Sequence, residues 1–102
     1  MNEIKALTDE IRAFAQARDW EQFHTPKNLA MAVTGEAGEL AAEFQWLTPA
    51  ESSRDSLSPE QFEAICLEIA DVQIYLLRLA DVLNVDIQEV VRKKLRINEN
   101  RF

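Results

Sequence analysis

Two helix starts marked by proline constrain the fold of this chain more than any other feature. At Thr25-Pro26 and at Ser58-Pro59, a residue that caps helices stands directly before a proline that suits the first helical position. Gln61 completes a capping box with Ser58, because its side chain can reach back to the backbone N–H of the cap. The sequence therefore predicts one helix that begins at residue 26 and another that begins at residue 59.

The lengths of these helices follow from where their apolar patterns stop. The helix from residue 26 can run to about Leu47, and the helix from residue 59 to about Leu83. Asn84 suits the left-handed conformation that often ends a helix. Between the two helices, the polar stretch that carries Ser and Pro is expected to be a loop, with room for one helical turn after Thr48.

Two further helices complete the expected fold. Apolar residues recur at three- and four-residue steps over residues 2–19, which predicts an amphipathic helix. Asp86 and Glu89 resemble a second capping pair and predict a last helix that continues towards the C-terminus. No alternation of apolar and polar residues indicates a strand. We expect an all-α fold, similar to a four-helix bundle, in a single domain over residues 1–102.

Composition and charge exclude several classes of protein. The chain has 102 residues, of which 47% are apolar, and a net charge of −7, which favours one folded domain and disfavours nonspecific nucleic-acid binding. No uninterrupted apolar run is long enough for a signal peptide or a membrane span. We therefore expect a cytoplasmic protein without nucleic-acid or membrane partners. Its single cysteine, Cys66, cannot form an internal disulfide and is expected to be buried.

Acidic residues lie on the apolar side of the second predicted helix. At about 100° per residue, Glu36, Glu39 and Glu43 fall on one stripe, and aliphatic residues share that side. The third predicted helix repeats the arrangement, because Glu68 and Asp71 lie in one row among aliphatic neighbours. Its other faces are also apolar, so we expect this helix to be central or at a subunit interface.

Inward carboxylates of this kind favour a bound cation. Like charges three residues apart on a helix repel, and carboxylates removed from water cost several kcal/mol unless they are paired or bound to metal. Glu36/Glu39 and Glu68/Asp71 are two such pairs on helices that must pack together. Oxygen ligands favour Mg²⁺ or Mn²⁺ over zinc. The only histidine, His24, lies outside both pairs, which also argues against the Glu-x-x-His pattern of a di-iron site.

A row of basic and polar residues, opposite in charge to the acidic rows, lies on the last predicted helix. Lys94, Asn98 and Arg101 share one side of it. These residues either complement the negative end of the helix dipole or face the acidic cluster and hold phosphate oxygens. Four inward acids with an implied cation and a basic row predict metal-bridged phosphate chemistry. The chain has no glycine-rich phosphate loop, so it is not a P-loop enzyme.

The same acidic residues are also compatible with a function of a different class. The acidic rows could pair with a basic partner, and the chain would then be a non-enzymatic helical interaction module. That hypothesis expects the acids to face solvent and no property to depend on Mg²⁺. The aliphatic neighbours of the acids argue against it.

The acidic pairs also carry a family resemblance. Glu-x-x-Glu in "GEAGEL" followed by Glu-x-x-Asp in "EIADV" resembles the signature of the MazG-like superfamily of all-α nucleoside triphosphate pyrophosphohydrolases. The segments "RDWEQFHTPKNLAMAVTGEAGELAAEFQW", "EIADVQIYLLRLA" and "KLRINENRF" are similar to the dCTP pyrophosphatase branch. The resemblance covers nearly the whole chain in order.

The resemblance implies a reaction and the residues that support it. A nucleoside triphosphate, with dCTP or a related deoxynucleotide favoured, is hydrolysed to the monophosphate and pyrophosphate, which cleans the nucleotide pool. The alternatives within this class are dUTP, dATP or a broad range of nucleotides. Glu36, Glu39, Glu68 and Asp71 match the family's catalytic Mg²⁺ ligands, for which Mn²⁺ is a possible substitute. One of these four residues, or Glu43, activates the attacking water.

The resemblance also implies a nucleotide-binding group and an assembly. Tyr75, Lys94, Asn98 and Arg101 match positions that contact the phosphates or the sugar. Family members of this size form homodimers or dimers of dimers, with the active site at the subunit interface. Chemistry alone favours core or interface anchors for tryptophans beside turns. The residues that resemble the family's base-recognition group, contributed in part by a neighbouring subunit, are Trp20, Phe23, His24 and Trp46.

Overall fold

A computed structural model describes residues 2–102 and contains helices but no strand over that range. The all-α prediction is therefore confirmed. Within residues 2–102, four α-helices are joined by turns that include two short 3-10 segments. In chain order the elements are α1 (Glu3–Ala17), η1 (Glu21–Phe23), α2 (Pro26–Ala42), η2 (Arg54–Ser56), α3 (Pro59–Val82) and α4 (Ile87–Arg101).

The caps that the sequence predicts are formed. The hydroxyl of Thr25 accepts a hydrogen bond from the backbone N–H of Asn28 at 3.2 Å, at the start of α2. At the start of α3, Ser58 and Gln61 exchange both hydrogen bonds of a capping box, at 2.9 and 3.1 Å. Asn84 has a φ of 57°, the left-handed conformation expected after α3. The local signals thus set where α2 and α3 begin.

Two local predictions need correction. Helix α2 ends at Ala42 rather than near Leu47, because the chain tightens into successive turns in which the N–H of Phe44 bonds the carbonyl of Ala41 and the N–H of Leu47 bonds that of Phe44. Cys66 is a free thiol that is half-buried rather than buried. The expected turn after Thr48 is present, since its carbonyl accepts from the N–H of Ser52 at 3.0 Å.

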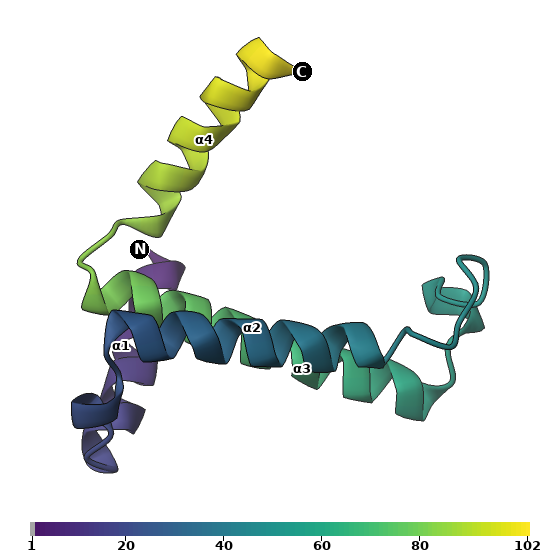
Figure 1. Cartoon of the computed structure of the whole chain (residues 1–102), viewed down its shortest axis with the longest axis horizontal. Coiled ribbons are helices and arrows are strands. Elements are labelled where there is room, and N and C mark those ends of the chain that lie inside the picture. Colours follow the sequence, from purple (N-terminus) through teal and green to yellow (C-terminus); the bar gives the residue numbers. More distant parts are fainter. Residues whose placement is uncertain (1) are drawn as a thin grey trace.

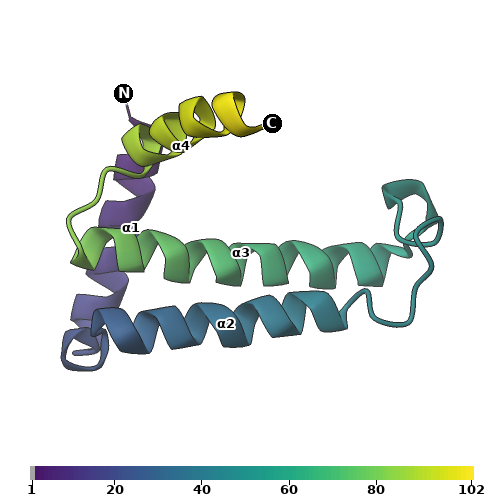
Figure 2. The same cartoon turned by 45° about the horizontal axis from the view of Figure 1, so that its top comes forward.

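Helices α2 and α3 lie side by side and run in opposite directions, and α1 crosses α3 near its C-terminal end (Figures 1 and 2). The small core lies where these three helices meet. Leu29 of α2 is 1% exposed, and the other buried apolar residues come from α1 and α3. They are Ala15, Ile65, Leu77 and Ala80.

Helix α4 departs from the predicted bundle. After Asn84 it projects away from the α2–α3 pair (Figure 1) and packs along none of the other helices. Its first residues, Ile87 and Gln88, line a pocket of about 320 Å³ together with residues at the start of α1. One chain therefore does not close a four-helix bundle. None of the helices in residues 2–102 is long and apolar enough to cross a membrane.

Candidate metal and nucleotide site

Three glutamates converge between α2 and α3. Glu36 and Glu39 are one turn apart on α2, and Glu68 lies on α3. One carboxylate oxygen from each residue lies within 4.8 Å of the others. The antiparallel pairing of the two helices brings these residues together, although they are about thirty positions apart in the sequence. We call Glu36, Glu39 and Glu68, together with Asp71, the acid cluster.

Asp71 lies one turn beyond Glu68 on α3 and is half-buried. It is outside the set of three converging carboxylates. Its charge nevertheless contributes to the raised pKa of both Glu36 and Glu68, so it belongs to the same electrostatic environment. Glu43 also contributes to the raised pKa of Glu68. The structure therefore gathers the acidic residues that the sequence predicted into one negative region.

The acid cluster lacks compensation from the rest of the chain. Burial raises the pKa of Glu36 above its ordinary value, and the charge of Glu39 raises it further. Burial and the charge of Glu39 act in the same direction on the pKa of Glu68. Oε2 of Glu36 and Oε2 of Glu68 are buried without a hydrogen-bond partner. Among residues 2–102, no lysine, arginine or histidine forms a salt bridge with the cluster.

These observations fit a hard divalent cation. The available donors are all carboxylate oxygens, which Mg²⁺ and Mn²⁺ prefer. Two of those oxygens are buried and unpartnered, and like charges separated by a few ångströms repel unless a cation lies between them. The residues present therefore match a magnesium or manganese site, with Glu36, Glu39 and Glu68 as the converging ligands.

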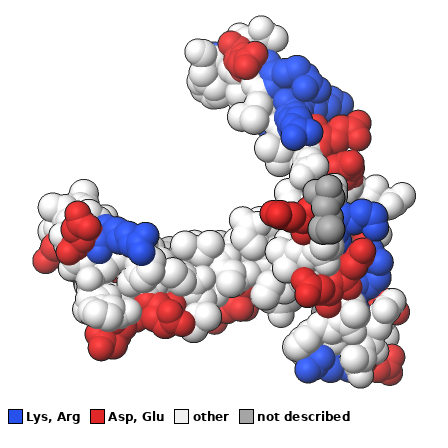
Figure 3. All heavy atoms as spheres, turned by 180° about the vertical axis from the view of Figure 1, so that it is seen from behind, with Lys and Arg blue, Asp and Glu red and all other residues white. Residues whose placement is uncertain are grey.

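Of the residues predicted to bind the phosphates or the sugar, one chain brings only some close to the acid cluster. Tyr75 is half-buried on α3, one turn after Asp71. Lys94, Asn98 and Arg101 are on α4, which packs along neither α2 nor α3, so one chain does not bring them beside the acids. The side-chain oxygen of Asn98 is buried without a partner. Figure 3 shows basic side chains gathered along α4 and a largely uncharged face over the α2–α3 pair.

The aromatic group predicted to recognise the base is divided between two places. Trp20 and His24 lie together in the α1–α2 connection, with ring centroids 6.2 Å apart. Phe23, in the same connection, is 59% exposed. Trp46 follows the other end of α2 and is 86% exposed. Since α2 has 17 residues, roughly 25 Å of helix separates Trp46 from the others, and one chain does not assemble this group.

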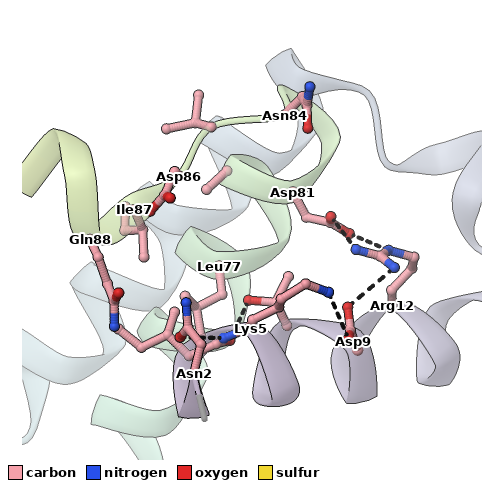
Figure 4. Close-up of a pocket in the computed structure, with 14 residues that line it drawn as sticks. Asn2, Lys5, Asp9, Arg12, Leu77, Asp81, Asn84, Asp86, Ile87 and Gln88 are labelled. Atoms are coloured by element: carbon pink, nitrogen blue, oxygen red, sulfur yellow. Dashed lines mark hydrogen bonds and ion pairs between the residues drawn. The ribbon is translucent and has the colours of Figure 1, made fainter.

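A second charged cluster was missed by the sequence reasoning. Arg78 of α3 is only 5% exposed and donates hydrogen bonds to Nδ1 of His24 at 3.1 Å and to Oδ2 of Asp81 at 2.9 Å. Arg12 of α1 holds the same Asp81 with two hydrogen bonds, at 2.8 and 2.6 Å (Figure 4). We call Arg12, Arg78, Asp81 and His24 the arginine cluster. The available signal was that Arg78, on the row of Asp71 and Tyr75, is the one basic residue in a helix whose other charged residues are all acidic.

The two clusters differ in their effect on pKa. Hydrogen bonds from Arg12, with the charges of Arg12 and Arg78, hold the pKa of Asp81 below its ordinary value despite burial. Burial lowers the pKa of His24, and the nearby charge of Arg78 lowers it further, while Glu21 acts in the opposite direction. The net shift favours the neutral form of His24 at neutral pH.

Comparisons with known proteins agree with this geometry. The MazG-like family matches residues 32–102. The chain is 47% identical over its whole length to dCTP pyrophosphatase 1 of Homo sapiens and 44% identical to that of Mus musculus, and it spans 58% of the length of each. Its fold matches a crystal structure of a pyrophosphatase from Archaeoglobus fulgidus with a TM-score of 0.90 and 36% identity, covering all of this chain and 94% of that one.

Proposed function

This chain belongs to the MazG-like family, and we propose that it hydrolyses nucleoside triphosphates to the monophosphate and pyrophosphate in a reaction that depends on Mg²⁺. The favoured substrate is dCTP or a related deoxynucleotide, because the curated relatives that cover the whole chain are dCTP pyrophosphatases. The same reaction on dUTP, dATP or a broad set of nucleotides is the alternative. Removal of such nucleotides would clean the nucleotide pool.

The uncompensated acid cluster carries this proposal. Glu36 and Glu68 each leave a buried oxygen without a partner, and no cationic side chain in residues 2–102 pairs with them. A module that pairs its acids with an external basic protein would expose all of them. Glu39 is exposed, against the expectation of four inward acids, but Glu36, Glu68 and Asp71 are half-buried. An anionic substrate can approach such a region only when a metal offsets the negative charge. The geometry therefore supports the enzyme over the interaction module.

The proposed mechanism divides the work among the residues of the chain. Glu36, Glu39, Glu68 and Asp71 would hold Mg²⁺, or Mn²⁺ in its place. When bound, the cation supplies positive charge that neutralises the phosphate oxygens. A carboxylate not engaged with the cation accepts a proton from the water that attacks the α-phosphorus. Glu43 is a candidate for this role, because it is half-buried and close enough to raise the pKa of Glu68.

A self-assembled homodimer or dimer of dimers would complete the site. Leu67, Ile69 and Ile74 of α3 are 58%, 48% and 42% exposed, and apolar residues along α4 are also exposed. Leu67 and Ile74, seven residues apart, lie on the same side of α3, and large apolar side chains exposed together are normally covered by a partner. We propose that assembly brings Lys94, Asn98 and Arg101 to an acid cluster, with Tyr75 beside it. A neighbouring chain would likewise unite the base group, Trp20, Phe23, His24 and Trp46.

The test is pyrophosphate release from a panel of deoxynucleoside and nucleoside triphosphates, with Mg²⁺ and with EDTA. Release that is strongest on dCTP and is abolished by EDTA supports both the reaction and the substrate. Release that is strongest on another nucleotide keeps the mechanism and changes the substrate. The absence of release from every nucleotide would overturn the proposed function.

A further inference from the structure

The arginine cluster contains a side chain whose orientation is fixed from three directions. The guanidinium of Arg78 donates through Nε to Nδ1 of His24 and through Nη1 to Asp81, and its Nη2 lies 3.8 Å from a carboxylate oxygen of Glu21. Asp81 is itself held by Arg12 across the α1–α3 contact (Figure 4). Because Arg78 is almost completely buried, it has little freedom to adopt another rotamer. The contact with His24 is therefore a fixed feature of the fold.

This contact determines which nitrogen of His24 carries the proton. A guanidinium group can only donate hydrogen bonds and does not lose its proton in proteins. Nδ1 of His24 must therefore be an unprotonated acceptor. In a neutral imidazole the proton then lies on Nε2, which becomes a donor. No described residue accepts a hydrogen bond from Nε2, and Nε2 is not among the buried atoms that lack a partner. The free donor is thus open to a ligand.

The position of this donor suits a nucleotide that reaches from the acid cluster. Arg78 lies seven residues after Asp71 and ten after Glu68 on α3, so it is about 10 Å along the helix axis from the nearest residue of the acid cluster and about 15 Å from the converging ligand on that helix. Asp71 and Arg78 lie on the same side of α3. A nucleotide whose phosphates lie at the acid cluster would extend its base along α3 towards His24. Trp20 lies beside His24 and offers an aromatic ring at the same place.

We propose that Arg78 is a positioning residue, which holds His24 as a fixed Nε2–H donor for an acceptor edge of the base, such as O2 or N3 of cytosine. This inference rests on the proposed function, since it concerns the base side of the same nucleotide site. Arg78 acts through His24 and does not itself touch the substrate. Asp81 and Arg12 support it by fixing the plane of its guanidinium group.

The first experiment needs no substrate and no variant. His24 is the only histidine of the chain, so the two imidazole nitrogens of the 15N-labelled full chain give an unambiguous spectrum in long-range 1H–15N correlation NMR. We expect one neutral tautomer, with the proton on Nε2, from pH 6.5 to pH 8. A proton on Nδ1, or an equal mixture of the two tautomers, would overturn the proposal. This result does not depend on catalytic activity, so a failure of the proposed function remains distinguishable.

The second experiment uses substitutions of Arg78 with a matched control. Arg78→Met keeps an apolar stem but has no hydrogen-bond donor, so we expect a mixture of the two His24 tautomers. We also expect the KM for the preferred nucleotide to rise about tenfold, which is the effect of one hydrogen bond. The kcat should change less than the KM. Arg78→Lys keeps a donor and should restore the tautomer at least in part. Glu63→Gln, at an exposed position of the same helix, should change neither property.

Two outcomes of the second experiment contradict the proposal. A single Nε2–H tautomer in Arg78→Met would show that Arg78 does not fix the ring. A tautomer mixture without any change in KM would show that the orientation of His24 does not matter for substrate. If Arg78→Met fails to fold, as judged by its helical circular dichroism, the wild-type spectrum and Arg78→Lys still decide the question.

Discussion

Helix α3 contributes to two charged clusters that differ in how the charge of their buried carboxylates is compensated. In the arginine cluster, Asp81 receives hydrogen bonds from both Arg12 and Arg78, so its charge is compensated within the chain. In the acid cluster, Glu36 and Glu68 each retain a buried oxygen without a partner. The arginine cluster is complete when the chain folds, whereas the acid cluster lacks a positive charge. This difference distinguishes carboxylates that hold the fold, such as Asp81, from carboxylates that lack a partner, such as Glu36 and Glu68.

The directions of the pKa shifts express the same contrast. Hydrogen bonds and positive charge lower the pKa of Asp81, whereas burial and neighbouring negative charge raise the pKa of Glu36 and of Glu68. A carboxylate with a lowered pKa stabilises the folded state at neutral pH, and one with a raised pKa destabilises it. The following predictions, from the largest expected effect to the smallest, use this contrast.

The largest effect is expected for neutralisation of the acid cluster. In Glu39→Gln or Asp71→Asn, pyrophosphate release should fall by more than about 100-fold, because even partners of metal ligands contribute factors up to that size. The helical circular dichroism signal should be largely unchanged, since neither side chain carries a salt bridge in the described structure. Retention of activity in both variants would contradict the metal assignment, and Glu63→Gln is the matched control.

A large loss of stability is expected instead for the arginine cluster. Asp81→Asn removes the carboxylate that compensates Arg78, which is buried. Removing one partner of a buried ion pair costs about 3 kcal/mol of unfolding free energy, and urea denaturation measures this loss. An equal loss in Asp9→Asn, whose carboxylate is bridged only at the surface, would argue against a special role for Asp81.

Magnesium should stabilise the folded protein through the acid cluster alone. At a concentration 100 times its dissociation constant, a ligand that binds only the folded state adds about 2.7 kcal/mol to the free energy of unfolding. We expect Mg²⁺ to raise the melting temperature of the wild type and of Asp81→Asn. It should leave Glu68→Gln unchanged. A similar rise in all three proteins would indicate binding elsewhere.

The smallest effects are expected in the pH dependence of the metal-free protein. The pKa of Glu36 and of Glu68 is raised, so the folded state binds more protons than the unfolded state just above pH 4.5. The contribution of these two glutamates to the free energy of unfolding therefore falls as the pH rises above 4.5. His24 has a lowered pKa, so its contribution is present above pH 6.5 and is lost as pH falls below it. The free energy of unfolding of each variant would be measured by urea denaturation across this pH range. Glu36→Gln should weaken the decrease in stability just above pH 4.5, and His24→Gln should remove the decrease in stability below pH 6.5.

The sequence predicted those parts of the fold and site that depend on local chemistry. The caps at Thr25 and Ser58 and the left-handed Asn84 formed as expected, because neighbouring residues determine them. The convergence of Glu36 with Glu68 followed from helical periodicity, which places each acid on the side that packs against the other helix. These features required only the sequence and the geometry of an α-helix.

Features that depend on contacts between distant segments were not predictable in the same way. The arginine cluster forms because α1 crosses α3 and brings Arg12 to Asp81, 69 residues away, and no local pattern encodes that crossing. The projection of α4 was also missed, because its apolar residues predict burial but do not say against which surface. The separation of Trp46 from Trp20 depends on the length and direction of α2, and a family resemblance along the sequence does not fix either one.

Equilibrium binding of Mn²⁺ tests the central claim most directly, because the free ion gives an electron paramagnetic resonance signal that is lost on binding. The wild type, Glu68→Gln and Glu63→Gln would be titrated in the absence of nucleotide. We expect the wild type and Glu63→Gln to bind Mn²⁺, Mg²⁺ to displace it from both, and Glu68→Gln to bind at least tenfold more weakly. Equal binding by all three proteins, or no binding by the wild type, would contradict the assignment of the acid cluster as a metal site.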